Sequence, residues 1–391
     1  MRSGIWTVGA VAGMALFLGS ILPAAAVDSD PTPGSSFSIS ETPTVQFEAK
    51  PGRYVRPPQV VAQSWIVADA ETGEIFASKD PDRRLPPAST LKMLTAVSLI
   101  DRLEGDSTFA PTLQDINQPG TKIGLRAGTP FVVSDLFAGM IMNSGNDAAS
   151  ALANAYGGWD NTLAIMNSEA ARLGATNTHA VTPNGLDKND QVSTSTDLAT
   201  IFRAAIDIPE IRKILATKEQ WMESPTTGRK MKLYNRNAML QWDYPGHIGA
   251  KTGYTSRAGN TLVAASERGG RTLVMAAMRT GMKMNTIAPR LFDWVASNDK
   301  DLVAIGTLPQ SQPRTDLQAI PAIAMEQEGG PVPGQEELLQ VAGVLGTDST
   351  SDSGQAAATA STYVVMAALG GTALIVLAVI YRRRRTGIDS T

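Results

Sequence analysis

Strand-like patterns stand at both ends of one long segment, and helical patterns fill the space between them. Near its start, Trp65–Ala68 and Glu74–Ala77 flank the turn residues Glu71–Gly73, which is a hairpin signal. Near its end, strand-like runs follow one another at 247–255, 260–265 and 271–278. We therefore expect an α+β fold in which N-terminal and C-terminal strands pair in one antiparallel sheet, covered by a helical region.

The helical patterns have recognisable starts. One helix is expected from near Ser89, directly after two prolines, and another from the cap-like pair Ser134-Asp135. Apolar residues at helical spacing predict further helices at about 162–173, 195–205 and 287–296.

Composition excludes several kinds of site. The chain has 391 residues, 43% of them hydrophobic, which is enough for one sizeable core or two modest ones. The net charge of −3 gives no basic footprint for nucleic acid, so no such partner is expected. There is no cysteine, which excludes disulfides and thiolate chemistry, and two histidines, His179 and His247, are too few for a multi-histidine metal site.

Both chain ends carry membrane signals. Residues 1–26 have an early arginine, an apolar run and the small residues Ala24–Ala26, which predicts a cleaved signal peptide, with an uncleaved anchor as the alternative. Residues 363–381 are uncharged and long enough to span a bilayer, and Arg382–Arg385 follow directly. The positive-inside tendency then predicts a single-pass membrane protein with its main domain outside the cytoplasm and a basic cytoplasmic tail at 382–391.

Two polar stretches bound the folded unit. Residues 27–59 are rich in Pro, Ser and Thr and are predicted to form a linker. Residues 309–362 are polar, with few large apolar side chains, and are predicted to form a low-complexity stalk. The expected catalytic domain is therefore 60–308.

Ser89 and Lys92 form an S-x-x-K pattern at the start of a helix. Residues three apart lie on one side of a helix, so the Lys92 amine can reach the Ser89 hydroxyl. A serine nucleophile needs an adjacent base, and burial can lower the pKa of a lysine enough for that role. The free N–H groups of the helix start can also stabilise an oxyanion beside Ser89. The alternative is an ordinary capping serine followed by a surface lysine.

Two later stretches have polar residues suited to the same chemistry. Ser144 and Asn146 stand two apart on a turn of small residues, where Ser144 can relay a proton and Asn146 can donate to a substrate amide or to the lysine. The alternative is a plain connection between helices. Lys251-Thr252-Gly253 lies on a strand, and the glycine lets a substrate backbone approach the strand edge.

The three motifs S-x-x-K, S-x-N and K-T-G occur here in the order shared by penicillin-binding proteins and class A β-lactamases. The chain resembles the low-molecular-mass penicillin-binding proteins that act as serine-type D-alanyl-D-alanine carboxypeptidases. The resemblance covers about 65–294 and includes A-D-A-E-T-G-E-I, R-L-P-P-A-S, M-N-S-G-N-D-A-A, T-P-N-G-L-D and K-T-G-Y-T-S-R-A-G.

The resemblance implies a mechanism. Lys92 deprotonates Ser89, which attacks the penultimate D-alanine carbonyl of a peptidoglycan stem peptide. The backbone N–H groups of Ser89 and Tyr254 hold the oxyanion, Ser144 passes a proton to the departing D-alanine, and water hydrolyses the acyl-enzyme. No metal or organic cofactor is implied, and β-lactams would acylate the same serine.

The resemblance also implies a substrate-binding set. Lys251, Thr252 and Thr255 would position the terminal carboxylate, with Gly253 and Asn146 beside the peptide. Arg279, after the last strand, is a candidate for assisting the carboxylate, although an exposed arginine is the plain alternative. His247 and His179 are interpreted as structural, because Ser89 lacks the G-x-S-x-G elbow of a serine-histidine hydrolase.

Other functions stay open at this stage. A β-lactamase would need a residue that activates deacylating water, and no counterpart of that glutamate is evident. A transpeptidase would use the same residues with a different acceptor. An inactive cell-wall-binding membrane protein would have lost a chemical residue, whereas Ser89, Lys92, Ser144, Asn146 and Lys251 are all present.

Overall fold

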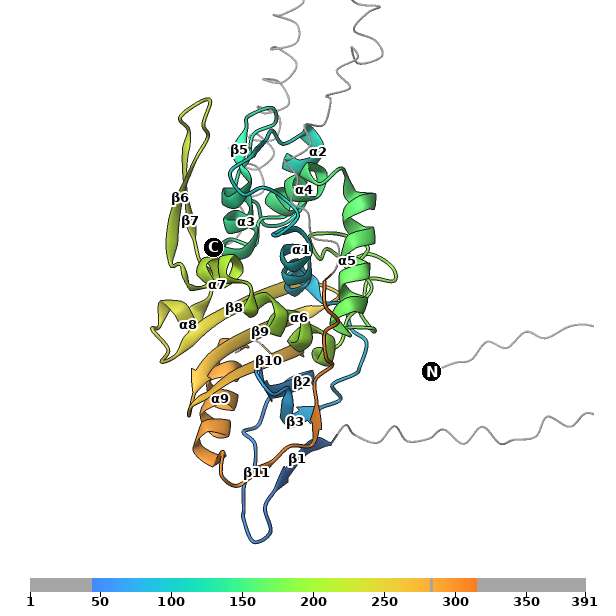
Figure 1. Ribbon diagram of the computed structural model, residues 1–391, viewed down its shortest axis with the longest axis vertical. Coiled ribbons are helices and arrows are strands. Elements are labelled where there is room, and N and C mark those ends of the chain that lie inside the picture. The colour runs from blue at the N-terminus through green and yellow to red at the C-terminus, as the bar shows by residue number, and fades with distance from the viewer. Residues whose placement is uncertain (1–43, 282–283, 315–391) are drawn as a thin grey trace, which may run out of the picture. The chain divides into compact units, whose positions relative to one another are not determined.

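The computed structural model describes residues 44–281 and 284–314. Its centre is the expected antiparallel sheet, in the order β11-β1-β3-β2-β10-β9-β8, with β12 paired to β3 (Figure 1). The N-terminal and C-terminal strands pair as predicted, for example where Met275 lies opposite Val67. The strands of this sheet are β1 (Val45–Ala49), β2 (Ala62–Asp69), β3 (Glu74–Lys79), β8 (His247–Thr255), β9 (Gly259–Arg268), β10 (Arg271–Thr280), β11 (Leu302–Val303) and β12 (Gly306–Thr307).

Helices cover both faces of the sheet. The larger group lies on one face, and α9 (Ile287–Asn298) packs on the other (Figure 1). The expected helices near 134, 162–173 and 195–205 are present as α3 (Val133–Met142), α5 (Trp159–Leu173) and α6 (Ser195–Asp207). The other helices of the described residues are η1 (Ala88–Leu91), α1 (Lys92–Leu99), α2 (Leu113–Ile116), α4 (Asn146–Ala155), α7 (Pro209–Ala216), α8 (Ala238–Gln241) and η2 (Met284–Thr286).

The central strand β10 contributes to two separate cores. Val274 and Ala276 belong to the core under the larger helical group, whereas Leu273 and Met275 belong to the core under α9. Successive side chains of a strand point to opposite faces, so a strand covered on both sides needs apolar residues at every position. This explains the unbroken apolar run in β10.

The sheet extends into the range that was predicted to be a linker. β1 lies within 27–59 and pairs with β3 and β11. Its sequence VQFEA alternates half-buried and exposed residues, as an outer strand does, but five residues among prolines and serines are a weak signal. Two small two-stranded sheets were also missed: β4 (Thr108–Phe109) with β5 (Phe131–Val132), and the hairpin of β6 (Glu219–Glu223) with β7 (Lys230–Tyr234).

The start of the predicted stalk also belongs to the folded unit. Arg314 donates to Asp101 Oδ2 at 2.6 Å, to Glu169 Oε1 at 2.5 Å and to the Val97 carbonyl at 2.7 Å. Arg172 binds the same Glu169 carboxylate at 2.7 Å. Burial alone would raise the pKa of Glu169, but the hydrogen bonds from Arg172 and Arg314 hold it below its usual value. Residues 309–314 are therefore fastened across α1 and α5.

The membrane predictions fall on other residues. Residues 1–26 and 363–381 lie outside the part of the chain that the structure describes. In the described ranges, no helix combines the length and apolar character needed to cross a bilayer.

The Arg314 contacts give a stability prediction. We expect Arg314→Ala to lower the free energy of unfolding of residues 28–361 by about 2 kcal/mol, because it leaves a buried carboxylate with one cation instead of two. The loss should shrink as the pH falls below about 4.5. There the unfolded chain takes up a proton at Glu169 before the folded protein does, so the stability that the lowered pKa of Glu169 contributes is gradually lost. Urea unfolding at several pH values measures both effects.

Arg53→Ala is the matched control for this measurement. Arg53 is 62% exposed and pairs with Asp301 at the surface, so its loss should cost less than about 1 kcal/mol. Equal effects of the two substitutions would contradict a structural role for residues 309–314.

Candidate active site

Ser89 lies in a tight helical turn that places Lys92 directly beside it. The predicted helix begins as the 3-10 turn η1, and α1 begins only at Lys92. A 3-10 helix has three residues per turn, so side chains three apart are aligned. The turn is fixed through the Pro87 carbonyl, which accepts hydrogen bonds from Thr90 Oγ1 at 2.6 Å and Thr261 Oγ1 at 2.9 Å.

The amine of Lys92 is fully buried and touches three oxygen atoms. Its Nζ lies 2.9 Å from Ser89 Oγ, 2.7 Å from Asn146 Oδ1 and 2.6 Å from the Asn184 carbonyl oxygen. Burial, assisted by the positive charge of Lys251, holds the pKa of Lys92 well below its ordinary value. A neutral amine keeps two N–H donors for the two carbonyl oxygens, and its lone pair then faces the Ser89 hydroxyl. The arrangement suits a general base.

A second buried lysine lies on the other side of the site. Lys251 Nζ donates to Ser144 Oγ at 2.9 Å and to the Thr252 carbonyl at 2.8 Å. Burial and the nearby charge of Arg236 lower the pKa of Lys251 to about 7. Ser144 has φ +62°, a left-handed conformation that non-glycine residues rarely adopt and that often marks a functional turn.

Asn146 and Asp147 fix the turn that follows Ser144. Asn146 Nδ2 donates to the Pro119 carbonyl at 2.6 Å, so its other atom, Oδ1, is presented to Lys92. The carboxylate of buried Asp147 accepts backbone N–H bonds from residues 123–125. This role of Asp147 is not predictable from the sequence, since one acidic residue in a helix carries no signal of such a distant contact.

The T-P-N-G-L-D loop supplies a third wall of the site. Asn184 provides the carbonyl that binds Lys92, and Asp187 Oδ1 accepts from Thr255 Oγ1 at 2.8 Å. Gly185 has φ +79°, and a Cβ atom there would lie 2.1 Å from the Ala88 oxygen. Neither contact was predicted from the sequence, because both join this loop to distant segments and the Asn184 contact is made by a backbone carbonyl.

Gly253 of the K-T-G motif packs against Ser89, the predicted nucleophile. A Cβ atom at this position would lie 2.6 Å from the Ser89 backbone nitrogen and 2.5 Å from Thr261 Oγ1. The sequence analysis attributed the glycine to close approach of a substrate. The structure gives a second reason, which is that the edge strand β8 must lie directly against the turn that carries Ser89.

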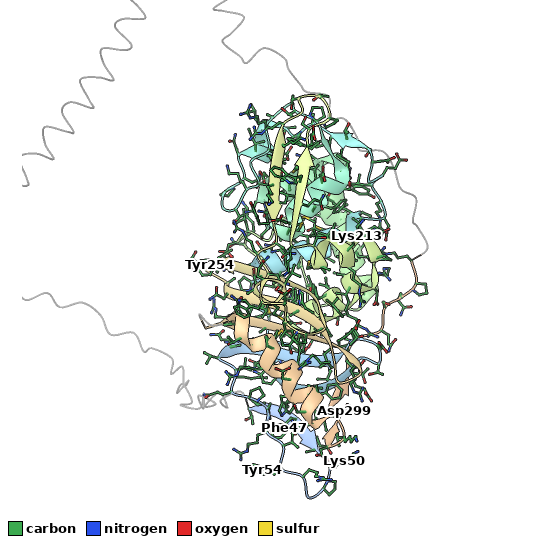
Figure 2. The ribbon with its side chains drawn as sticks, turned by 90° about the vertical axis from the view of Figure 1, so that its left-hand side faces the viewer. Phe47, Lys50, Tyr54, Lys213, Tyr254 and Asp299 are labelled. Atoms are coloured by element: carbon green, nitrogen blue, oxygen red, sulfur yellow. The ribbon has the colours of Figure 1, made fainter. Side chains whose placement is uncertain are left out.

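The other predicted binding residues lie along or beyond β8. Thr252 is partly buried, and Tyr254 is 67% exposed at the surface where the sheet meets the helical part (Figure 2). Thr255 is engaged with Asp187. Arg279 sits at a bulge of β10 with φ +50° and donates to the Arg257 carbonyl, so it binds the β8–β9 turn.

The histidines have local partners. His247 Nε2 lies 2.6 Å from Asn237 Nδ2, and burial lowers the pKa of His247 to about 4. His179 Nδ1 lies 3.0 Å from the Asp190 carbonyl oxygen. Within residues 44–281 and 284–314, no group of three or more acidic or histidine side chains could hold a metal ion.

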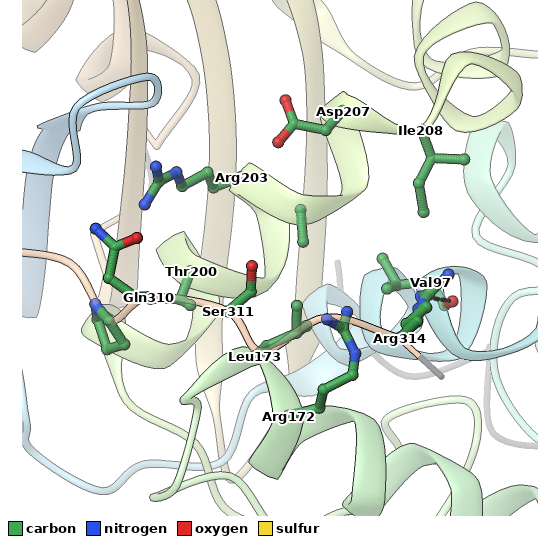
Figure 3. Close-up of a pocket in the computed structure, with 12 residues that line it drawn as sticks. Val97, Arg172, Leu173, Thr200, Arg203, Asp207, Ile208, Gln310, Ser311 and Arg314 are labelled. Carbon is green, nitrogen blue, oxygen red and sulfur yellow. Dashed lines mark hydrogen bonds between the residues drawn. The ribbon is translucent and has the colours of Figure 1, made fainter. Parts of the chain in front are cut away.

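Two cavities lie apart from these residues. One of about 350 Å³ is lined by α5, α6 and residues 309–314 (Figure 3). The other, of about 480 Å³, includes Ser134, Lys213 and Gln220 in its lining. Neither is lined by Ser89, Lys92, Ser144 or Lys251.

Known proteins share both the sequence and the fold. The family model for D-alanyl-D-alanine carboxypeptidases, peptidase family S11, matches residues 52–281, more than half of the chain. D-alanyl-D-alanine carboxypeptidase DacB2 of Mycobacterium tuberculosis is 41% identical over 223 residues, which cover 56% of this chain and 76% of that protein. DacC of Escherichia coli is 34% identical over 246 residues, but these span only 59% of its length.

Solved structures give the same result. A D-alanyl-D-alanine carboxypeptidase from M. tuberculosis aligns with a TM-score of 0.61 and 40% identity, covering 66% of this chain and 99% of that one. The Streptomyces K15 DD-transpeptidase aligns with a TM-score of 0.58 and 27% identity, covering 61% and 98%. The chain therefore belongs to the D-alanyl-D-alanine carboxypeptidase family, as the three sequence motifs and their convergence around Ser89 indicate.

Proposed function

We propose that the chain removes the terminal D-alanine from peptidoglycan stem pentapeptides through an acyl-enzyme on Ser89. The observation that carries this proposal is the buried Lys92 amine at 2.9 Å from the Ser89 hydroxyl. Its depressed pKa leaves a lone pair available for the serine proton. The chain's family and its DacB2 relative support the same activity.

Acylation involves the groups that contact Ser89. Lys92 takes the hydroxyl proton as Ser89 Oγ attacks the carbonyl carbon between the two D-alanines. The backbone N–H groups of Ser89 and Tyr254 are proposed to hold the oxyanion, in keeping with the close packing of Gly253 on Ser89. The C–N bond then breaks, and the leaving amine needs a proton.

Ser144 and Lys251 are suited to the leaving group. Ser144 Oγ can pass a proton to the departing amine, because Lys251 Nζ holds that hydroxyl in place at 2.9 Å. The charged Lys251 also attracts the terminal carboxylate, with Thr252 beside it. Thr255 and Arg279 remain proposed carboxylate partners, and Thr255 would have to give up its bond to Asp187 to take that role.

The acyl-enzyme is then released by water, which regenerates Ser89. A β-lactam would acylate the same serine, because its strained amide presents a carbonyl and a nearby carboxylate. Transfer to an amine in place of water would make the protein a transpeptidase, and the family and curated relatives favour hydrolysis.

The central prediction concerns the two residues of S-x-x-K. Incubation with a stem pentapeptide should release one D-alanine, seen by mass spectrometry as a tetrapeptide. Ser89→Ala and Lys92→Ala should each lower kcat by about 10³-fold or more, since both belong to one catalytic unit. His247→Gln is the control and should retain most activity. Tetrapeptide formation by Ser89→Ala at the normal rate would refute the mechanism.

The two lysines also predict a pH profile. Lys92 must be neutral and Lys251 charged, so kcat/KM should fall in acid as Lys92 is protonated and fall again as the pH rises through about 7, where free Lys251 loses its proton. A pentapeptide with an amidated C-terminus should be a poorer substrate without the alkaline fall. The same alkaline fall with both peptides would contradict a carboxylate role for Lys251.

We also propose that residues 363–381 anchor the protein in the membrane, with the catalytic unit outside and the arginine-rich tail in the cytoplasm. The support is the uncharged length of that segment and the four arginines that follow it. The proposed N-terminal signal peptide would direct export, with cleavage after Ala26.

Fractionation of cells tests the anchor. The full chain should stay in the membrane after alkaline carbonate washing, whereas a chain that stops after residue 362 should be released. Release of the full chain by the same wash would show that 363–381 does not span the bilayer.

A further inference from the structure

The β6–β7 hairpin exposes two aromatic side chains near the turn that carries Ser144. Trp221 is 62% exposed and Tyr234 is 53% exposed, although large aromatic side chains are usually mostly buried. Figure 1 shows the hairpin standing along one side of the helical region. Nothing in the proposed chemistry of Ser89 uses these two rings.

The hairpin has distinct inner and outer faces. On the inner face, Met222 and Leu233 are buried in the main core, and Gln220 donates to Asp135 Oδ1 at 2.8 Å. The strand register places the other side chains together on the outer face. We define the outer face by its six residues, Glu219, Trp221, Glu223, Lys230, Lys232 and Tyr234.

Lys232 connects the two rings on this face. Its Nζ lies 5.7 Å from the centroid of the Trp221 ring and 5.1 Å from that of Tyr234, and it pairs with Glu219 at 2.8 Å. The second ion pair, between Lys230 and Glu223 at 3.3 Å, balances the remaining charges. The outer face therefore has two positive and two negative charges around two rings, which suits an uncharged ligand rich in hydroxyl groups better than an anionic polymer or lipid.

The outer face adjoins the turn that carries Ser144. The Tyr234 N–H donates to Asn143 Oδ1 at 3.0 Å, and the Arg236 N–H donates to the Met142 carbonyl at 3.1 Å. Asn143 directly precedes Ser144. A ligand that is bound at Ser89 and extends past Ser144 on this side would come next to Tyr234, and the inner-face contacts hold the hairpin in that position.

The side chains of the outer face also fit the chemistry of a glycan. Sugar rings stack their C–H faces on aromatic rings, and their hydroxyls bond to carboxylates and amines.

We propose that the outer face of the β6–β7 hairpin binds the glycan strand that bears the stem peptide, with Trp221 and Tyr234 as stacking platforms. This inference rests on the proposed function, because it takes the peptide in the cleft to be attached to that glycan. It predicts that the enzyme prefers a stem peptide attached to a glycan over the same peptide free in solution.

The test compares two substrates that share one pentapeptide. One is the free peptide, and the other has the peptide attached to a short glycan of repeating disaccharides. For the full chain in detergent, kcat/KM should be higher for the glycan-linked peptide. Trp221→Ala should reduce this preference about tenfold, as expected for loss of one aromatic stack, and Trp221→Phe should retain part of it. An unchanged preference in Trp221→Ala would overturn the inference.

Tyr54→Ala is the matched control. Tyr54 is 85% exposed with Arg56 over its ring at 5.4 Å, and it lies at the far end of the described unit (Figure 2). Its loss should leave the preference as it was. A similar fall in both variants would mean that any exposed ring produces the effect, and would overturn the assignment.

Calorimetry separates this inference from the proposed function. Ser89→Ala cannot turn over, yet it should bind a peptide-free glycan, and addition of Trp221→Ala should weaken that binding about tenfold. Glycan binding without any peptidase activity in the parent chain would leave the surface standing while the proposed function failed. No glycan binding by Ser89→Ala would overturn the surface, and would leave a protein partner as the remaining occupant of the outer face.

Discussion

The active site depends on the burial of one amine among uncharged oxygens. Lys92 Nζ has three hydrogen-bond partners, a hydroxyl, an amide oxygen and a backbone carbonyl. A carboxylate in contact would have kept the amine charged, whereas neutral acceptors leave the desolvation penalty uncompensated. The nearby carboxylate of Asp147 is occupied by backbone N–H groups and acts on Lys92 only at a distance. The fold thus gives Lys92 the lowered pKa that its proposed role as a base requires.

Two glycines allow the walls of the site to approach Ser89. Gly185 comes from the loop after α5, and Gly253 comes from the edge strand of the sheet, and each packs on the backbone of Ala88–Ser89. Any Cβ atom at either position would overlap this turn. The nucleophile is therefore held between a sheet edge and a loop, with Ala88 in the left-handed region at φ +51°. Such fixed geometry reduces the reorganisation that catalysis requires.

The two buried lysines have different roles in the proposed reaction. Burial, assisted by the positive charge of Lys251, lowers the pKa of Lys92, while burial and the charge of Arg236 lower the pKa of Lys251 to about 7. Burial disfavours the charged form of both amines, and at Lys92 the charge of Lys251 adds to that effect. A neutral base and a charged carboxylate partner are the two states that the proposed reaction needs.

The sequence by itself determined the antiparallel sheet and most of the larger helices, and it singled out Ser89, Lys92, Ser144, Asn146 and Lys251 as candidates, because side-chain type and regular spacing are local properties of the chain. It missed β1 and the attachment of residues 309–314, since short outer elements among polar residues have weak periodicity. Only the tertiary structure decided that the Asn184 carbonyl binds Lys92, that Asp187 holds Thr255 and that Gly253 packs on Ser89. Those contacts join segments far apart in the chain, and two of them use backbone atoms, which carry no residue-specific signal.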